Sequence, residues 1–395
     1  MYYLIIIAFI SPLMVLFLAP LTFAKRSSHT DAIVASLAIG LSFALVCHGI
    51  TYSDPEVDAL RIMRECAATR GLPIFDVLAS PPSETTSLFL LNLWEWIVGQ
   101  IGDLRLFQTI AAFFGYSMLA WLMFDCMASG RCTKSEFATI LVFVLIAVPM
   151  QTVVGNVRST LVCIMTATAF YIQSKREGPS IPALCILILS CGIHVIGYVG
   201  LLLWTFRKPA VVHPWKVSAA FIGGIALVSF FAFILSSFFG SLGFINDFLQ
   251  KLLLYKEGTD YDQVNAGKIT TQLTHVMELL LLCLMVLRLK VAGRKSQLVS
   301  LSIVSIACTF AMELLLVNVG TRLMYLPLLM SACAFLCGEK GPSARRQVHI
   351  LILLDLSICI IAFALSGYSW IYFLRTFNWE DVLLGAVFFP ASLFL

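Results

Sequence analysis

Apolar runs follow one another along the whole chain and are separated by short polar segments. Many are long enough to cross the hydrocarbon layer of a bilayer, which takes about 20 helical residues. They do not alternate apolar and polar positions, as the strands of a membrane barrel would. The pattern predicts an all-α, polytopic integral membrane protein with roughly 11–13 transmembrane helices and short re-entrant or interfacial helices. The first run, residues 2–23, lacks a basic start and is interpreted as one span.

The composition agrees with this pattern, because 60% of the 395 residues are hydrophobic and only 12% are charged. No internal repeat, linker or soluble segment is visible, so residues 1–395 are expected to form a single transmembrane domain. The net charge of +4 is better explained by loop topology than by binding to nucleic acid. The 12 cysteines form no Cys-x-x-Cys pair and lie mostly inside apolar runs, so we expect neither a disulfide nor a structural metal site.

The distribution of basic residues predicts which loops face the cytoplasm. By the positive-inside rule these are the basic segments 24–28, 129–134, 173–177, 206–216, 288–296 and 339–347. The connections that remain are then expected to face outward: 52–85, 151–157, 241–272 and 318–321. The two long outer loops are 52–85, which is charged and rich in proline, and 241–272, which begins with an amphipathic stretch typical of a helix on the membrane surface.

This topology requires two irregular segments. Between Ser83 and Gly102 lies a short apolar stretch in which Glu95 stands between Trp94 and Trp96, and a span there would put the next loop on the wrong side. We interpret this segment as an interfacial or re-entrant helix. Residues 181–206 have basic segments on both sides, yet hold only one full span. They form either two half-length helices that meet near residues 190–200, or one full span with a loop on the unexpected side.

Three residues inside or beside the apolar runs are candidates for chemistry. The guanidinium of Arg158 offers a planar set of donors that suits phosphate, although an arginine there can also reach to the lipid headgroups. His194 lies inside an apolar run. It is either a base or a core histidine that is hydrogen-bonded to a backbone carbonyl. Arg322 is expected to start a helix just after an outward turn, with Tyr325 one turn further, and Glu313 can pair with it.

The long outer loops add acids, a lysine and an aromatic residue to these candidates. Asp54, Asp58 and Glu84 lie in the first loop, and Lys251 and Tyr255 lie in the second. They are substrate-binding candidates, although a solvated acidic loop and an interfacial tyrosine explain them equally well. No P-loop, Gly-x-Ser-x-Gly, His-Glu-x-x-His or Asp-x-Asp motif is visible, so we expect no metal and no cofactor.

Several segments resemble the EpsG family of polysaccharide polymerases, a branch of the Wzy-like enzymes. The closest is 156–204, in which an arginine opens a helix, a basic turn follows, and a histidine lies inside the next apolar run. The other similar segments are 52–61, 83–110, 248–258 and 320–327. The chain departs from the family pattern at "YSDPEVD", where a Gly-Asp-Tyr order is commoner, and at Ser159, where glutamine is common.

The resemblance implies a GT-C-like membrane glycosyltransferase at the outer face of the bacterial cytoplasmic membrane. It would join polyprenyl-pyrophosphate-linked repeat units, with chain-length regulator and flippase proteins as partners and no nucleic acid. In this scheme Arg158 and Arg322 bind the pyrophosphate, and His194 or an outer-loop acid takes the acceptor proton. Tyr325 and Tyr255 orient lipid or sugar. A lipid-linked glycan ligase, a flippase or transporter of such glycans, and an acyltransferase that uses His194 remain alternatives.

Overall fold

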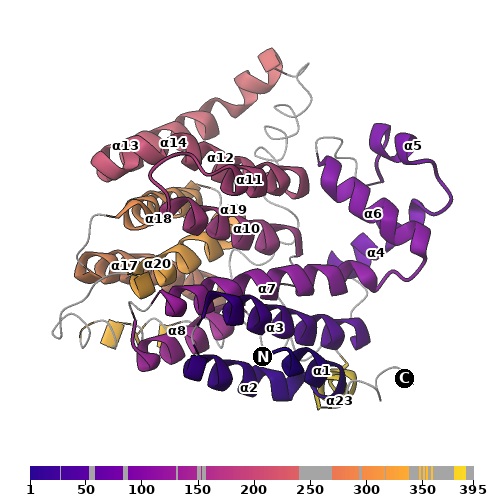
Figure 1. The fold of residues 1–395 in the computed structure, drawn as a ribbon. Helices are drawn as coiled ribbons and strands as arrows, with labels where there is room; N and C mark the ends of the chain where they lie inside the picture. The colour runs from indigo at the N-terminus through magenta and orange to yellow at the C-terminus, as the bar shows by residue number, and fades with distance from the viewer. Residues whose placement is uncertain are drawn as a thin grey trace.

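The computed structural model describes residues 1–26, 28–52, 58–82, 88–129, 132–148, 153, 157–239, 269–292, 296–315, 317–337, 347, 350–351, 353–354, 357–358 and 378–387. All regular elements within these residues are helices, as the sequence predicts (Figure 1). In chain order they are α1 (Tyr3–Ile10), α2 (Pro12–Arg26), α3 (His29–Gly49), α4 (Asp58–Ala68), α5 (Ile74–Ala79), α6 (Phe89–Ile101), α7 (Leu106–Ala128), α8 (Lys134–Ala147), α10 (Val157–Ser174), α11 (Ile181–Ile193), α12 (Ile196–Thr205), α13 (Arg207–Val212), α14 (Pro214–Phe239), α17 (Ile269–Ala292), α18 (Gln297–Leu315), α19 (Val317–Leu323), α20 (Tyr325–Cys337) and α23 (Trp379–Val387).

Within the described residues, four stretches are long and apolar enough to cross a membrane. They are α3, α7, α18 and the nearly continuous stretch Val319–Cys337 of α19 and α20. Shorter apolar helices accompany them, at Pro12–Lys25, Ile181–Ile193, Ile196–Thr205 and Pro214–Val228. These helices support the membrane class expected from the sequence, whereas the expected total of 11–13 spans stays a prediction.

The first apolar run is two helices and not the single span expected from its length. Helix α1 ends at Ser11, and Pro12 opens α2. The Tyr3 hydroxyl lies 3.0 Å from the Thr22 hydroxyl, so α1 folds back along α2. A proline lacks the N–H that a continuing helix would donate, but it fits the first turn of a new helix. The Ser-Pro pair therefore makes a helical hairpin out of a run that hydropathy alone reads as continuous.

Side-chain contacts bring the ends of the long helices together in two groups. His29 at the start of α3 and Lys175 just after α10 both contact Asp125 near the end of α7. The Cys126 sulfur lies 3.4 Å from that of Cys337 at the end of α20. We call this the basic end, because the basic segments 24–28, 129–134, 173–177 and 339–347 adjoin it. Its orientation toward the cytoplasm stays a prediction.

The other end of the bundle, here called the opposite end, is held by contacts between α3 and α7. Gln108 Nε2 donates to the Cys47 carbonyl, and the Tyr52 hydroxyl donates to Gln108 Oε1. His48 Nδ1 lies 3.1 Å from the Thr109 hydroxyl. Helices α3 and α7 are therefore antiparallel over their whole length. One basic segment needs correction, because Arg288 of the expected loop 288–296 is a fully buried residue within α17.

Helices α11 and α12 form a hairpin, which decides between the two alternatives for residues 181–206. The chain breaks at His194 and Val195, and Gly197 lies against the backbone of Ser190 and Cys191. At the other end of the hairpin, Trp204 Nε1 donates to Gln173 Oε1 near the end of α10. At 1.5 Å per residue, each arm is about 20 Å or less, short of a full crossing. Both arms therefore start from the basic end, as the half-length alternative requires.

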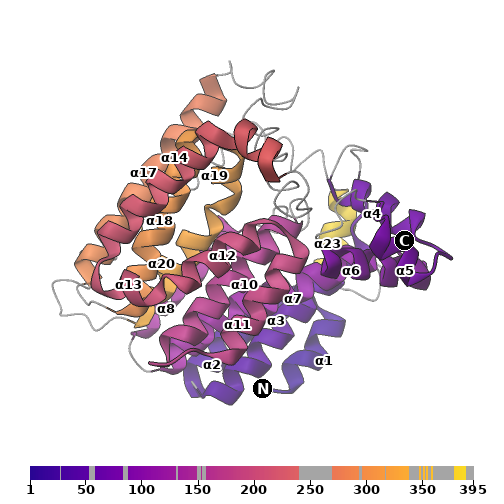
Figure 2. The same cartoon turned by 90° about the horizontal axis from the view of Figure 1, so that it is seen from above.

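Helices α4, α5 and α6 lie together beside the opposite end, at the right in Figure 1 and Figure 2. Helix α6 has 13 residues and is not among the apolar helices able to span, so the expected short helix with Trp94 and Trp96 is confirmed. Within its described residues, the expected first outer loop 52–85 contains the two helices α4 and α5. The expected amphipathic helix of loop 241–272 lies outside the described residues, except that 269–272 begin α17.

Candidate functional site

One small hydrophobic cluster at the opposite end brings two of the sequence candidates, Arg158 and His194, near Glu95. It consists of buried residues of α4, α6 and α7 together with Val157, and Trp94 and Val195 pack against it. We call it the α6 cluster. It brings the middle of α6, the first residue of α10 and the tip of the α11–α12 hairpin to one place. The residues next to these three in the chain are Glu95, Arg158 and His194.

Arg158 is the second residue of α10, as expected for an arginine that opens a helix. It is half-buried and lies close enough to Glu95 for its charge to act on that carboxyl. The first turn of a helix carries the positive end of the helix dipole, which disfavours a cation there. The local backbone therefore gives no reason for an arginine at this point. The helix dipole would instead add to the attraction that Arg158 exerts on an anion.

His194 occupies the break between α11 and α12 and is 9% exposed. Its backbone is extended, and its N–H donates to the Ser190 carbonyl at 3.1 Å. Its ring nitrogen Nδ1 lies 3.3 Å from the Ile196 N–H, which can only donate. In the neutral ring Nδ1 is then the acceptor, and the proton is assigned to Nε2. Its place at the hairpin tip agrees with the expected break, and its catalytic role stays a prediction.

Tight packing fixes α6 against its neighbours. A Cβ on Gly192 would lie 2.7 Å from Phe89, so the hairpin tip is in close contact with the start of α6. A Cβ on Gly99 would lie 2.3 Å from the Cys66 carbonyl, so the end of α6 touches α4 equally closely. The Trp94 ring stacks on Phe107 of α7 with centroids 4.2 Å apart. The position of α6 is therefore set from three sides.

Glu95 is a site residue that the sequence analysis placed only as a polar residue between tryptophans. Its side chain is fully buried, and neither carboxyl oxygen has a hydrogen-bond partner among the described residues. The pKa of Glu95 is raised to about 8, chiefly by burial and also by the nearby Glu65 carboxylate. Arg158 and Arg61 act in the opposite direction and lower that pKa. A glutamate that retains a proton near neutral pH, beside an arginine, is typical of sites that transfer protons.

Arg322 does not start a helix after a turn, as the sequence suggested. It lies in the last turn of α19, and residues 318–321 of the expected outward turn are themselves helical. Gly320, within the expected turn, allows close packing, since a Cβ there would lie 2.4 Å from the Glu313 Cα. The Cys163 sulfur lies 3.5 Å from the Arg322 carbonyl, so α19 meets α10 five residues after Arg158. Both arginines thus lie along the first half of α10.

Tyr325 starts α20, and its surroundings lie near the middle of α7. Its phenol lies near that of Tyr116 of α7, whose hydroxyl donates to the Val148 carbonyl at 3.3 Å. Val148 lies three residues before the start of the expected outer connection 151–157. A turn at Met324 lies between Arg322 and Tyr325, but the Met324 N–H donates to the Gly320 carbonyl at 3.0 Å and the stretch Val319–Cys337 is nearly continuous. The expected shared face of the two residues stays a prediction. The two residues nevertheless stay within one turn of chain.

Two acids converge beside Arg322. The Thr321 hydroxyl lies 3.3 Å from Glu278 Oε2 of α17 and 3.5 Å from Glu313 Oε2 of α18. Glu313 is 3% exposed. The expected ion pair between Glu313 and Arg322 stays a prediction. The Glu313 carboxylate lies beside Thr321, the residue that precedes Arg322. Three helices therefore contribute polar groups around α19.

Most of the loop candidates lie outside the described residues. These are Asp54, Glu84, Lys251 and Tyr255, whose substrate-binding roles stay predictions. Asp58 is the first residue of α4, whose later residues join the α6 cluster, and its role is likewise a prediction.

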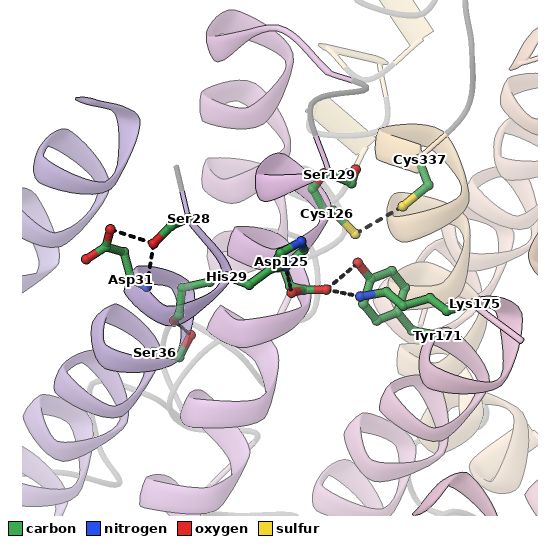
Figure 3. Close-up of polar contacts among 11 residues, drawn as sticks. Ser28, His29, Asp31, Ser36, Asp125, Cys126, Ser129, Tyr171, Lys175 and Cys337 are labelled. Carbon is green, nitrogen blue, oxygen red and sulfur yellow. Dashed lines mark hydrogen bonds and ion pairs between the residues drawn. The ribbon is translucent and has the colours of Figure 1, made fainter. Parts of the chain in front are cut away.

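A second polar cluster, at the basic end, was not expected from the sequence (Figure 3). Asp125 of α7 is 3% exposed and receives three side chains from two other parts of the chain. His29 Nδ1 lies 2.6 Å from Oδ1, the Tyr171 hydroxyl donates to Oδ2 at 2.7 Å, and the Lys175 ammonium donates to the same oxygen. The Lys175 nitrogen also lies 4.4 Å from the centre of the Tyr171 ring. We call these four residues the Asp125 cluster.

Arg288 is a second buried charge that the sequence analysis assigned to a loop. It is fully buried in α17, donates to the Ser331 hydroxyl of α20, and its guanidinium lies 5.7 Å from the centre of the Phe143 ring of α8. Its position just after an apolar run made it resemble a loop cation. The arginine instead links three helices near the basic end.

Among the residues that the structure describes, no group of three or more His, Cys, Asp or Glu side chains is placed to hold a metal ion. The 11 described cysteines are free thiols. No family model matches the chain, and no curated protein or solved structure matches it.

Proposed function

We propose that the chain is a GT-C-like membrane glycosyltransferase that joins polyprenyl-pyrophosphate-linked sugar repeat units at the opposite end of the bundle. The observation that supports this most is the position of Arg158. A guanidinium and the N-terminus of an 18-residue helix coincide there, beside the tip of the α11–α12 hairpin. An anion at this place would gain from both the fork of donors and the helix dipole.

The proposed reaction requires a binding site for an anion within the membrane. Pyrophosphate is a good leaving group, so the main task of the enzyme is to hold it and to neutralise the charge that develops on it. Arg158 and Arg322, on helices that touch at Cys163, are suited to that task. Short helices that do not cross the bilayer are tolerated where they line a cavity, and α6 and the α11–α12 hairpin are two such elements. Both substrates would then arrive by diffusion within the membrane.

The remaining candidates take roles around this anion site. His194 would orient the acceptor sugar through its Nε2 proton, since its Nδ1 faces the Ile196 N–H. Tyr325 would contact the lipid or sugar of the donor near the outer connection. The acceptor distinguishes this polymerase from a lipid-linked glycan ligase, which would use the same donor and the same anion site.

The test uses the full-length protein in liposomes with a lipid-linked oligosaccharide, and the length of the product glycan is measured. Arg158→Lys and Arg322→Lys keep the charge but lose the fork of donors, so we expect each to reduce transfer by roughly 10- to 100-fold. Arg105→Lys is the control, because Arg105 is half-exposed at the same end and pairs with Asp103 at 3.3 Å. It should stay near wild-type activity.

Three outcomes would contradict the proposal. Wild-type chain length in both Arg→Lys variants would remove the pyrophosphate role of the arginines. Movement of the lipid-linked sugar across the bilayer without a new glycosidic bond would indicate a flippase instead. Transfer of the glycan to a lipid other than the polyprenyl carrier would indicate a ligase.

A further inference from the structure

We propose that Glu95 is the catalytic base that accepts the proton of the attacking sugar hydroxyl; this rests on the proposed glycosyl transfer. The carboxyl is fully buried on a short helix, and neither oxygen has a hydrogen-bond partner among the described residues. A buried carboxyl without donors costs free energy relative to a hydrogen-bonded one. Such a group is expected where its bonding capacity is used by a ligand.

The surroundings of Glu95 place it at the proposed anion site. Trp94, its neighbour in the chain, packs into the α6 cluster together with Val157 and Val195. Arg158 follows Val157 and acts electrostatically on Glu95. A donor whose pyrophosphate is held by Arg158 would therefore have its reacting sugar close to the carboxyl. Arg158 is half-exposed, and we expect the acceptor to approach from its exposed side.

The titratable groups on the elements around α6 favour a proton acceptor at Glu95 over one at His194. Those elements are α4, α5, α7, α10 and the hairpin, and their titratable residues near this end are Arg61, Arg64, Glu65, Cys66, Asp76, Arg105, Arg158, Cys191 and His194. Glu65 is engaged by Arg61, whose Nη1 lies 2.5 Å from its Oε1. His194 already accepts at Nδ1 and presents a donor at Nε2. Of the carboxyl groups on these elements, Glu95 is the one that is fully buried beside Arg158.

The proposed step is balanced as follows. The acceptor hydroxyl oxygen attacks the anomeric carbon of the donor sugar, and its proton passes to the Glu95 carboxylate. The bond between the anomeric carbon and the pyrophosphate oxygen breaks, and its electron pair leaves with the polyprenyl pyrophosphate held by Arg158 and Arg322. Glu95 then loses the proton to water at the opposite end. A base whose pKa lies near the working pH is effective at such a transfer.

The experiment measures initial transfer rates of full-length protein in liposomes, together with binding of the lipid-linked donor. Glu95→Gln keeps the shape but cannot accept a proton, so we expect the rate to fall by roughly 10²- to 10⁴-fold with donor binding retained. The matched control is Glu136→Gln. Glu136 is also fully buried, but it belongs to a capping box with Thr133 at the basic end, where glutamine serves equally well. Its rate should stay within about twofold of wild type.

A pH series gives a second readout on the wild-type protein. If Glu95 is the base, the rate rises with pH between about pH 6 and pH 8, by up to about tenfold per unit below the pKa of the carboxyl. An infrared band of a protonated carboxylic acid should be present at neutral pH and absent in Glu95→Gln. This series decides the matter even if Glu95→Gln does not fold.

The outcomes separate this proposal from the proposed function. An inactive wild-type protein that binds no lipid-linked donor would overturn the glycosyl transfer and the role of Glu95 with it. An active wild-type protein with near wild-type transfer in Glu95→Gln would overturn the role of Glu95 alone. A rate that does not change with pH over the same range would also overturn it.

Discussion

Two buried carboxyl groups, one at each end of the bundle, have opposite surroundings. Asp125 at the basic end is 3% exposed and binds His29, Tyr171 and Lys175. Glu95 at the opposite end is fully buried, and its two oxygens have no hydrogen-bond partner among the described residues. The sequence around each is similarly apolar. The comparison shows that burial alone does not tell what an acid does, whereas its partners do.

The two surroundings suggest different roles because of the cost of burying a charge. A carboxylate that accepts several charged or polar hydrogens is compensated for its loss of water. Asp125 therefore holds the ends of α3, α7 and α10 together. An uncompensated carboxyl instead keeps its proton, as the raised pKa of Glu95 indicates. It holds bonding capacity that a substrate can use.

The sharpest test of the comparison removes the charge at Asp125. Asp125→Asn keeps the size of the side chain, but it leaves the buried Tyr171 and the Lys175 ammonium without a carboxylate. We expect a loss of about 3 kcal/mol in the free energy of unfolding, because hydrogen bonds to charged groups each contribute about 1.5–3 kcal/mol. Thermal unfolding in detergent measures it. Transfer per folded molecule should stay near wild type.

Glu95→Gln in the same unfolding assay is the matched comparison, and it should not destabilise the protein at neutral pH. If Asp125→Asn loses less than about 1 kcal/mol, or Glu95→Gln loses as much as Asp125→Asn, the distinction between the two acids fails.

The second prediction concerns the pH dependence of stability at Glu95. Its ordinary pKa of 4.5 is raised to about 8 in the folded protein, chiefly by burial. The folded state therefore binds more protons than the unfolded state between these values, so stability is highest below the ordinary pKa and falls as the pH rises through about 8. From about pH 6 to about pH 7.5 the loss should reach at most about 2 kcal/mol.

This loss is measured as the fall in melting temperature across the pH series. Glu95→Gln should flatten that part of the series, and Asp125→Asn should leave it in place. A series with the same slope in wild type and Glu95→Gln would contradict the raised pKa and weaken the comparison.

The elements around Glu95 could be predicted from the sequence better than the contacts within them. Basic segments on both sides of residues 181–206 left two alternatives, two half-length helices or one full span with a loop on the unexpected side, and the structure shows the two short helices. Trp94 and Trp96 in a short apolar stretch likewise indicated a short helix, which is α6, and its place at the membrane interface stays a prediction. Charge and length act locally, so the pattern of the chain reveals them.

Long-range packing is not visible in such patterns. The partners of Asp125 are separated from it by 96 residues at His29 and by 50 at Lys175. No local sequence pattern distinguishes Asp125, which is buried, from an acid in a loop. The expected outward turn at residues 318–321 is helical for a related reason, because Gly320 there serves the close contact of α19 with Glu313. The Ser-Pro pair between α1 and α2 is a local signal for a helix break. The interpretation of the run as one span rested on its length instead.

The smallest expected effect separates the members of the Asp125 cluster. The Lys175 side chain is 41% exposed, whereas the carboxylate that it contacts is 4% exposed. Lys175→Met keeps an unbranched apolar stem against the rings of Trp121 and Tyr171 and removes only the charge. Asp125 retains the imidazole of His29 and the hydroxyl of Tyr171. We therefore expect a loss of about 0.5–1 kcal/mol in the free energy of unfolding, the range of a solvent-accessible ion pair.

Salt provides the check on this small value. Water reaches the lysine, so its attraction to Asp125 should be screened, and the difference between wild type and Lys175→Met should shrink as the ionic strength rises. The Asp125→Asn loss should persist in high salt, because the hydroxyl of Tyr171 is buried with the acid. If Lys175→Met alone reproduces the full loss of Asp125→Asn and salt does not reduce it, a single ion pair would hold the helix ends together. The basic end would then depend on one charge, and its contrast with Glu95 would rest on that lysine alone.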